Sequence, residues 1–430
     1  MATAQHTMQS YEVMGGQSLK AALAKAERRN KIRAFMLVAP LLLFITFTFL
    51  APIVRMMYFS FDNPVIVETF PKTIEALDSW NPTGAPTPSE SVFQVFAEEI
   101  SRASKERTIG KAATRLNYDK GGMRSLMTKT GRKISRMQAG PFMEGKWKQA
   151  FLDIDKDWGD RDVWVTIKQA GERFTPSYYL KALDLNRAAD GSIVKEPENR
   201  RLYLLTGLDS VWVRTFWISA AVTILCVLLG YPVAYLLANL PLRYSNLLMI
   251  LVLLPFWTSL LVRTTAWVVV LQTEGVLNDL LMATHVIDHR VQLIFNRFGV
   301  LVAMTHILLP FMILPIYSVM KNIPPSYERA ARSLGATPWT AFWRVYFPQS
   351  LAGIGAGGLL VFILALGYYI TPALVGGPTD QMVSYFIADH TNRSLNWGLA
   401  SALGGILLAG VLAVYILYDK LVGIDNMKLG

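Results

Sequence analysis

Residues Leu351–Val375 read LAGIGAGGLLVFILALGYYITPALV and contain no charged side chain. A helix needs about 20 predominantly apolar residues to cross the ~30 Å hydrocarbon core of a bilayer. This stretch exceeds that length. It therefore predicts a membrane-spanning helix, and the same criterion applies outward along the chain.

Six stretches meet this criterion: Ala34–Val54, Thr215–Leu240, Leu247–Leu271, Phe298–Met320, Leu351–Val375 and Trp397–Tyr418. Within them Arg263 is the only charged side chain and His306 the only imidazole. Prolines interrupt the stretches, which membrane helices tolerate when their neighbours satisfy the freed carbonyls. We expect an all-α membrane protein whose six transmembrane helices pack around a pathway.

The composition supports a membrane protein and divides the chain. Of its 430 residues 52% are hydrophobic and 17% charged, and the mean hydropathy is +0.32. Residues 60–210 carry 44 charged side chains, whereas the other 279 residues carry 29. We therefore predict a basic amphipathic N-terminus at 1–33, a first transmembrane helix at 34–59, a polar insert at 60–210 and a five-helix core at 211–430.

The polar insert contains helix-like patterns. Apolar residues recur at helical spacing in Ser91–Ile109, Lys146–Asp155 and Asp162–Gln169. Asn81–Ser89 is rich in proline and threonine, which favours a loop. The insert is therefore expected to be mainly helical.

The basic residues predict an orientation. If the N-terminus is cytoplasmic, the inner segments hold 13 Lys and Arg, and the short outer loops hold three, namely Arg290, Arg297 and Arg393. Cytoplasmic loops collect basic residues, whereas long domains cross the membrane largely regardless of charge. We expect both termini in the cytoplasm and the insert in the periplasm. The net charge of +11 then reflects topology and does not indicate nucleic acid.

The longest inner loop, Lys321–Ser350, reads KNIPPSYERAARSLGATPWTAFWRVYFPQS. Pro325 and Glu328 suit the start of a helix, and Gly335 suits its end. Tyr327, Ala330, Ala331 and Leu334 would form its compact apolar face. A second short helix is expected over Trp339–Tyr346, ended by Pro348. A short helix with small side chains on the inner surface can be held by another protein.

This loop resembles the EAA loop of the permease subunits of binding-protein-dependent ABC importers. The family pattern is Glu-Ala-Ala, three residues, Gly, nine residues, then Ile-x-Leu-Pro. Here Arg329-Ala330-Ala331, Gly335 and Val345-Tyr346-Phe347-Pro348 follow at the same spacing, with Arg329 in place of Glu and Glu328 one residue earlier. Leu254–Thr258 and Tyr369–Gly377 are similar to the spermidine/putrescine branch.

The resemblance implies a transport function. Two permease subunits would form the pathway, two ATPase subunits would bind ATP and Mg, and a periplasmic binding protein would deliver the solute. The residues implied to contact the ATPase are Glu328, Arg329, Ala330, Ala331, Leu334, Gly335 and Pro348. This chain would be a bacterial inner-membrane subunit without catalytic residues of its own.

Four side chains are candidates for the pathway: Trp257, Arg263, Tyr368 and Tyr369. Aromatic faces attract amines, although aromatic residues also pack at membrane boundaries. Arg263 either faces protein or water, or extends its charge to the outer surface. No Asp or Glu lies in the six stretches, so selectivity for a polyamine would come mainly from the binding protein or the second permease.

Other motifs are weak. Gly140–Lys146 begins like a phosphate-binding loop, but Trp147 occupies the magnesium-binding Ser/Thr position. With one cysteine, Cys226, and no complete ligand set, we predict no metal site and no cofactor in this chain. An opine-type conjugate, a phosphonate or ferric iron is the alternative solute. A membrane-anchored sensor or assembly protein, with residues 60–210 as its recognition domain, is the alternative class.

Overall fold

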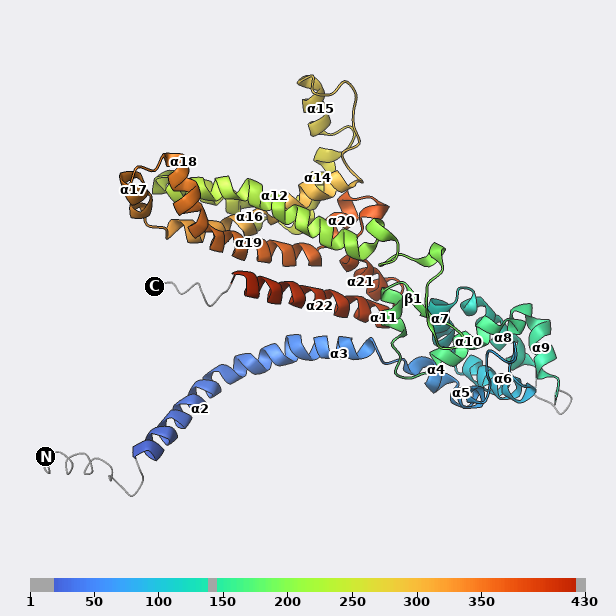
Figure 1. Cartoon of the computed structure of the whole chain (residues 1–430). Coiled ribbons are helices and arrows are strands. Elements are labelled where there is room, and N and C mark those ends of the chain that lie inside the picture. The colour runs from blue at the N-terminus through green and yellow to red at the C-terminus, as the bar shows by residue number, and fades with distance from the viewer. Residues whose placement is uncertain (1–18, 138–144, 423–430) are drawn as a thin grey trace, which may run out of the picture. The chain divides into compact units, whose positions relative to one another are not determined.

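The computed structural model describes residues 19–137 and 145–422, which fall into two units, Met1–Tyr58 and Phe59–Gly430. In the first unit, α2 (Leu19–Ile45), a π-helical turn (Thr46–Leu50) and α3 (Ala51–Phe59) form one continuous helix (Figure 1). Pro52 lacks an N–H and would crowd the carbonyl of Thr48, and the wider π turn lies at that point. The apolar run Ala24–Phe59 has none of its most apolar window buried, as expected of a helix that lipid surrounds.

The insert is mainly helical, as predicted. Its elements are α4 (Pro64–Thr69), α5 (Pro71–Asp78), α6 (Glu90–Lys105), α7 (Ile109–Asp119), α8 (Met123–Arg136), α9 (Trp147–Ile154), α10 (Arg161–Ala170), α11 (Ser177–Ala182), β1 (Leu185–Arg187) and β2 (Ile193–Lys195). The two strands form an antiparallel hairpin with Asn186 opposite Val194. The helix predicted over Ser91–Ile109 ends at Lys105, because Arg107 takes a positive φ of 59° and α7 starts a new direction.

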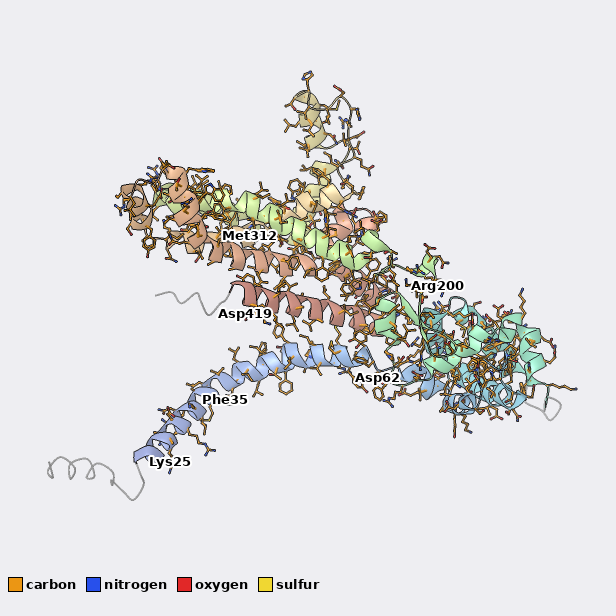
Figure 2. The ribbon with its side chains drawn as sticks, in the orientation of Figure 1. Lys25, Phe35, Asp62, Arg200, Met312 and Asp419 are labelled. Carbon is orange, nitrogen blue, oxygen red and sulfur yellow. The ribbon has the colours of Figure 1, made fainter. Side chains whose placement is uncertain are left out.

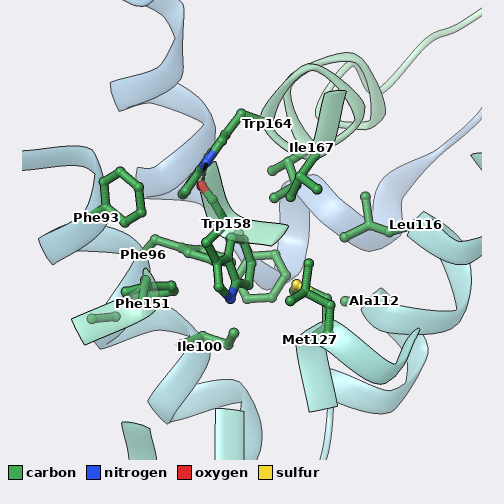
Figure 3. Packing of buried hydrophobic residues seen from close by; sticks show 14 of the residues in the cluster. Phe93, Phe96, Ile100, Ala112, Leu116, Met127, Phe151, Trp158, Trp164 and Ile167 are labelled. Carbon is green, nitrogen blue, oxygen red and sulfur yellow. Dashed lines mark hydrogen bonds between the residues drawn. The ribbon is translucent and has the colours of Figure 1, made fainter. Parts of the chain in front are cut away.

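An aromatic core holds the helices of the insert together (Figure 3). Phe93, Phe96, Phe151, Trp158 and Trp164 are fully buried, and the centroids of their contacting rings lie 4.6 to 5.6 Å apart. Both indole N–H groups are satisfied: Trp158 donates to Thr130 Oγ1 and Trp164 to the Trp158 carbonyl, each at 2.9 Å. Buried aromatic pairs with satisfied polar atoms are stabilising. The insert therefore has a hydrophobic core of its own.

The C-terminal part of the chain forms a helical core. It contains α12 (Val211–Asn239), α13 (Leu242–Leu253), α14 (Leu260–Leu271), α15 (Val276–Ala283), α16 (Arg297–Lys321), α17 (Pro325–Ser333), α18 (Pro338–Ala341), α19 (Phe347–Gly367), α20 (Ile370–Val375), α21 (Val383–Asn392) and α22 (Trp397–Val422). Over the described residues, six helical runs are long and apolar enough to cross a membrane. The predicted fold class is therefore confirmed.

Two predicted spans are interrupted. Leu247–Leu271 is divided between α13 and α14 by a 3-10 turn at Leu254–Trp257, because Pro255 cannot continue the helix and Ser259 starts the next one by capping Val262. Consequently the third spanning run comprises Leu260–Ala283. Leu351–Val375 breaks at Tyr368, which takes an extended conformation between α19 and α20.

The expected stop at Pro348 was wrong. Pro348 lies in the first turn of α19, and α18 joins α19 through a π-helical turn, Phe342–Tyr346. The missing N–H of Pro348 and the crowding of its ring against the preceding turn are absorbed where the backbone widens. The helix that enters the membrane therefore begins in the loop itself, at Pro338.

The centre of the core depends on close contact between α16 and α19. A Cβ atom built on Gly353 would lie 2.9 Å from Ile316 Cα, and one on Gly357 would lie 2.9 Å from Met312 Sδ. Met312 lies on α16 in the helical core (Figure 2). Small residues let membrane helices approach closely. The Gly353–Gly357 pair thus packs against α16, which confirms the close helix packing that a GxxxG pattern favours.

A Gly353→Ala substitution is expected to destabilise this contact. The added methyl would meet backbone atoms of Ile316 and Pro315, which cannot rotate away, and overpacking of this kind costs about 1–3 kcal/mol. Thermal unfolding of the purified protein in detergent measures the loss. Gly358→Ala is the matched control, because its Cβ would have Thr223 Cγ2 at 3.9 Å as its nearest neighbour. Equal stability of the two variants would contradict the close contact.

Candidate functional site

The loop between α16 and α19 contains a short, sharply ended helix. Pro324 precedes α17 in an extended conformation and Pro325 is its first residue, which fits the tolerance of proline at that position. At the other end Gly335 has a φ of +90°, the Gly335 N–H donates to Arg332 O at 3.0 Å, and the Ala336 N–H donates to Ala331 O at 3.1 Å. These two bonds form a Schellman motif. The predicted helix and its glycine stop are therefore both present.

The apolar residues of α17 lie on the surface. Every residue of the helix is at least partly exposed, and Leu334, at its end, is 90% exposed. Trp339 in α18 is 71% exposed. A run of exposed apolar side chains on rigid helices is typical of a protein-binding surface. We call Pro325–Ala341 the coupling segment.

The charged side chains of the coupling segment differ in how freely they could contact a partner protein. Glu328 is half-buried and forms an ion pair with Arg332 one turn later, whereas Arg329 is exposed. The carboxylate at 328 is therefore engaged within its own helix. Arg329, at the position where the family usually has Glu, presents its charge to solvent, and Arg332 is exposed as well.

The four pathway candidates fall at the two helix breaks or beside them. Trp257 ends the 3-10 turn and is 78% exposed, and Tyr369 is exposed in the break between α19 and α20. Thr264, next to Arg263, and Thr371, three residues after the half-buried Tyr368, have their hydroxyls 3.2 Å apart. The structure thus places Arg263 and Tyr368 on neighbouring elements, with Trp257 and Tyr369 on more exposed surface.

His306 belongs to the same region. Trp267, one turn after Arg263 on α14, donates a hydrogen bond from Nε1 to His306 Nδ1 at 3.1 Å. The sequence favoured a packed, hydrogen-bonded histidine here. The hydrogen bond is present, but the side chain is exposed on the surface of this chain. Its position next to Arg263 could not be inferred from the sequence, because it requires α14 to pack against α16.

A polar cluster that the sequence did not single out closes the insert end of the core. Arg297 Nε forms an ion pair with the buried Asp380 at 3.2 Å and lies over the ring of Trp217 at 5.6 Å. Arg214 donates to the Gln381 carbonyl at 3.0 Å. These contacts join α12 and α16 to the segment after α20. The useful sequence signal was Asp380, an acid two residues after Gly376-Gly377-Pro378.

The insert is attached to the core at the end of α7. Arg115 donates to Asp119 at 2.6 Å, Lys181 of α11 pairs with the same carboxylate, and the Tyr118 hydroxyl donates to the Ser394 carbonyl next to α22. Burial alone would raise the pKa of Asp119, but Arg115 and Lys181 outweigh it and hold the pKa below its usual range. Asp119 is therefore ionised at neutral pH and bridges two parts of the insert.

A second attachment runs through Tyr203 and His390. The Tyr203 hydroxyl and His390 Nε2 are 2.8 Å apart, and His390 Nδ1 lies 3.0 Å from Ser394 Oγ. Burial lowers the pKa of His390 and raises the pKa of Tyr203. Both side chains are therefore neutral near pH 7. They form an uncharged link between the end of the insert and α21.

Asp184 organises the chain where the insert returns to α12. It is 2% exposed, has a φ of 57°, and its carboxylate accepts four backbone N–H groups at 2.6 to 2.9 Å. The four donors are Leu202, Tyr203, Leu204 and Leu205. One side chain thus fixes the segment that leads into the first helix of the core.

Replacing Asp184 with alanine is expected to release this segment. Four backbone donors would lose their acceptor, which should cost about 2–3 kcal/mol. Thermal unfolding, together with limited proteolysis between residues 196 and 210, measures the effect. Asp190→Ala serves as the control, because Asp190 is exposed and bonds only within its own turn, to Ser192. Resistance to protease as strong as in the wild type would refute the assigned role.

Comparison with known proteins identifies the core. Residues 227–422 match the family described as "Binding-protein-dependent transport system inner membrane component". The spermidine/putrescine transport system permease protein PotB of Haemophilus influenzae is 35% identical over 214 residues, which cover 49% of this chain and 74% of that protein. The chain belongs to this family. It is a permease subunit of the ABC importer class, a multi-pass inner-membrane transport component and not an enzyme.

Other relatives extend the comparison. PotB of Escherichia coli K12 is 35% identical over 207 residues, covering 48% of this chain and 75% of the relative. The E. coli inner membrane ABC transporter permease protein YdcU is 32% identical over 226 residues, covering 49% and 70%. A crystal structure of a bacterial ABC transporter that imports alginate aligns with a TM-score of 0.41 at 19% identity, covering 49% of this chain and 78% of that chain.

The family match begins at residue 227, so the insert lies outside it. Residues 138–144, which include part of the phosphate-loop-like stretch, lie outside the described residues.

Proposed function

We propose that this chain forms part of the pathway of an ATP-driven importer for a polyamine or a related small cationic metabolite. The coupling segment carries the ATP-driven part of the proposal. It presents exposed apolar side chains on a short helix, α17, that begins at Pro325 and ends before Gly335. The next helix, α18, continues through the π turn into α19. A push on the segment would therefore reach a membrane helix directly.

The proposed partners follow from this arrangement. Two ATPase subunits bind ATP and Mg and hold the coupling segment through Glu328, Arg329, Ala330, Ala331, Leu334 and Gly335. Pro348 lies where the moving segment enters the membrane. With the coupling segment inside, both termini are cytoplasmic and the insert is periplasmic. A second permease subunit completes the pathway, which Trp257, Arg263, Tyr368 and Tyr369 line.

The insert is proposed as a docking platform for the periplasmic binding protein. Its aromatic core makes it a rigid body. Asp184, the Tyr203–His390 pair and Tyr118 fasten it to the segment that leads into α12, to α21 and to the segment before α22. A rigid body fastened at the mouth of the pathway can position a binding protein over that mouth. This support is independent of the solute.

The polyamine assignment rests on the relatives named for spermidine and putrescine. Its test is the binding protein encoded with this chain, purified and titrated with spermidine, putrescine, an opine, a phosphonate and ferric iron. We expect the two polyamines to bind most tightly and their uptake to require this chain. Tighter binding of one of the other solutes would replace the polyamine assignment. Uptake that does not need the chain would instead favour a sensor or assembly role.

A further inference from the structure

Three side chains with N–H or O–H donors lie on neighbouring elements of the core that are far apart in sequence. Arg263 comes from α14, His306 from α16, and Tyr368 from the break after α19. Trp267, one turn after Arg263, donates to His306 Nδ1 at 3.1 Å, and the hydroxyls of Thr264 and Thr371 lie 3.2 Å apart. In agreement, α14 packs against α16 and α20 (Figure 1). The cluster is therefore a feature of the folded core and not of one helix.

Arg263 and His306 both lie within helices that are apolar and long enough to cross the membrane. His306 is nine residues into α16, or about 14 Å along its axis. Arg263 lies in the first turn of α14, where the spanning run Leu260–Ala283 begins. A charge in such a run is costly unless it faces protein or water. The guanidinium of Arg263 therefore needs an acceptor or water.

The cluster has donors in excess. His306 Nδ1 accepts the hydrogen bond of Trp267, so a neutral His306 carries its proton on Nε2 as a donor. Two nitrogens of Arg263, Nε and Nη1, are covered by protein and have no acceptor among the described residues. Neither α14, α16 nor the segment Leu351–Val375 contains an Asp or Glu. The elements that carry the cluster therefore offer Arg263 no carboxylate of their own.

The breaks in the helical backbone near the cluster indicate on which side an acceptor for Arg263 would bind. The 3-10 turn at Leu254–Trp257 precedes the helix that carries Arg263, and Tyr368 is itself the break after α19. Non-helical backbone at membrane depth is tolerated where it is covered by protein or lines a water-filled cavity, and not where it faces lipid. The open side of the cluster thus faces the pathway or the second permease subunit.

We propose that Arg263, with His306 and Tyr368, forms a carboxylate-binding site in the core of the transporter. A carboxylate accepts two parallel N–H bonds from a guanidinium, which is the strongest pairing available to a buried arginine. The proposal rests on the proposed function as a permease. If the solute is a polyamine, the carboxylate belongs to an Asp or Glu of the second permease subunit, because an arginine alone repels a dication. A solute with its own carboxylate would fill the site directly.

The test uses the assembled transporter, with the second permease and the ATPases, in lipid nanodiscs. Variants Arg263→Gln and Arg263→Lys are compared with Arg243→Gln, which removes an exposed arginine from the neighbouring α13. The first measurement is the fraction of permease subunits that remain paired on dilution. The second is the melting temperature of the transporter in the presence of putrescine or of 4-aminobutyrate. Putrescine has an amine at both ends, whereas 4-aminobutyrate has an amine at one end and a carboxylate at the other.

Either source of the carboxylate gives a distinct result. A carboxylate from the second subunit predicts that Arg263→Gln weakens pairing about tenfold, Arg263→Lys less, and Arg243→Gln not at all. A carboxylate from the solute predicts that 4-aminobutyrate, and not putrescine, raises the wild-type melting temperature, with about tenfold weaker binding in Arg263→Gln. The proposal is overturned if Arg263→Gln matches Arg243→Gln in both measurements.

Uptake by the wild-type transporter separates this proposal from the assignment of the solute. Failure to import polyamines, with a clear effect of Arg263→Gln on pairing or on 4-aminobutyrate binding, would reject the polyamine and keep the site. Polyamine uptake with no effect of Arg263→Gln would reject the site and keep the polyamine.

Discussion

Solute uptake by a Gly335→Val variant is expected to fall about tenfold or more, while the protein still inserts in the membrane. Gly335 has a φ of +90°, a conformation that costs an L-residue about 1–2 kcal/mol and a β-branched residue more. Valine would force the chain out of this conformation and break the hydrogen bonds from Gly335 and Ala336 that end α17. The exposed Leu334 would then be displaced, and the ATPase subunit would bind the coupling segment less tightly. Uptake of labelled solute and solute-stimulated ATP hydrolysis are the measurements.

Two controls separate backbone strain from bulk. Gly335→Asn adds a side chain but tolerates positive φ, so it should retain most of the uptake. Gly110→Val adds the same side chain to an equally open glycine of the insert that lacks positive φ, and it should import like the wild type. An asparagine variant as impaired as the valine variant would show that bulk at the partner surface, and not the shape of the loop, decides coupling.

The parts of the fold that the sequence predicted depend on local chemistry. Apolar length identified six spans, and Gly335 revealed the end of α17, because a left-handed residue after a helix favours glycine whatever surrounds it. The effect of a proline was harder to predict. Pro255 divides a span into two helices, whereas Pro348 continues a helix through a π turn. Hydropathy alone does not distinguish these outcomes, because both segments remain apolar.

The candidate sites were predictable to different degrees. The coupling segment is continuous in sequence, so its residues could be named together. The pathway cluster is not: Arg263 stood out because a charge is costly at membrane depth, but only the packing of α14 on α16 places His306 beside it. Asp184 could not be identified at all. Its role lies in four contacts to backbone N–H groups about 20 residues away, and no side-chain pattern records them.

Replacing Asp119 with asparagine is expected to destabilise the insert by about 3 kcal/mol. The substitution removes one partner from a largely covered ion-pair network and leaves the buried Arg115 and Lys181 without their carboxylate. Because the folded-state pKa of Asp119 is below its usual value, its contribution is complete above about pH 4 and is lost as the pH falls further. Unfolding followed by tryptophan fluorescence between pH 3 and pH 7 should therefore show a smaller pH dependence in the variant.

The loss should also reach transport, because Asp119 follows Tyr118, whose hydroxyl holds the Ser394 carbonyl at the start of the last helix. If the insert positions the binding protein, a loosened α7 should weaken docking and raise the concentration of loaded binding protein needed for half-maximal uptake. Maximal uptake should change little, since the coupling segment is untouched. Asp157→Asn is the matched control, because Asp157 is exposed in the same insert. Loss of maximal uptake with unchanged docking would instead place the insert in the transport step itself.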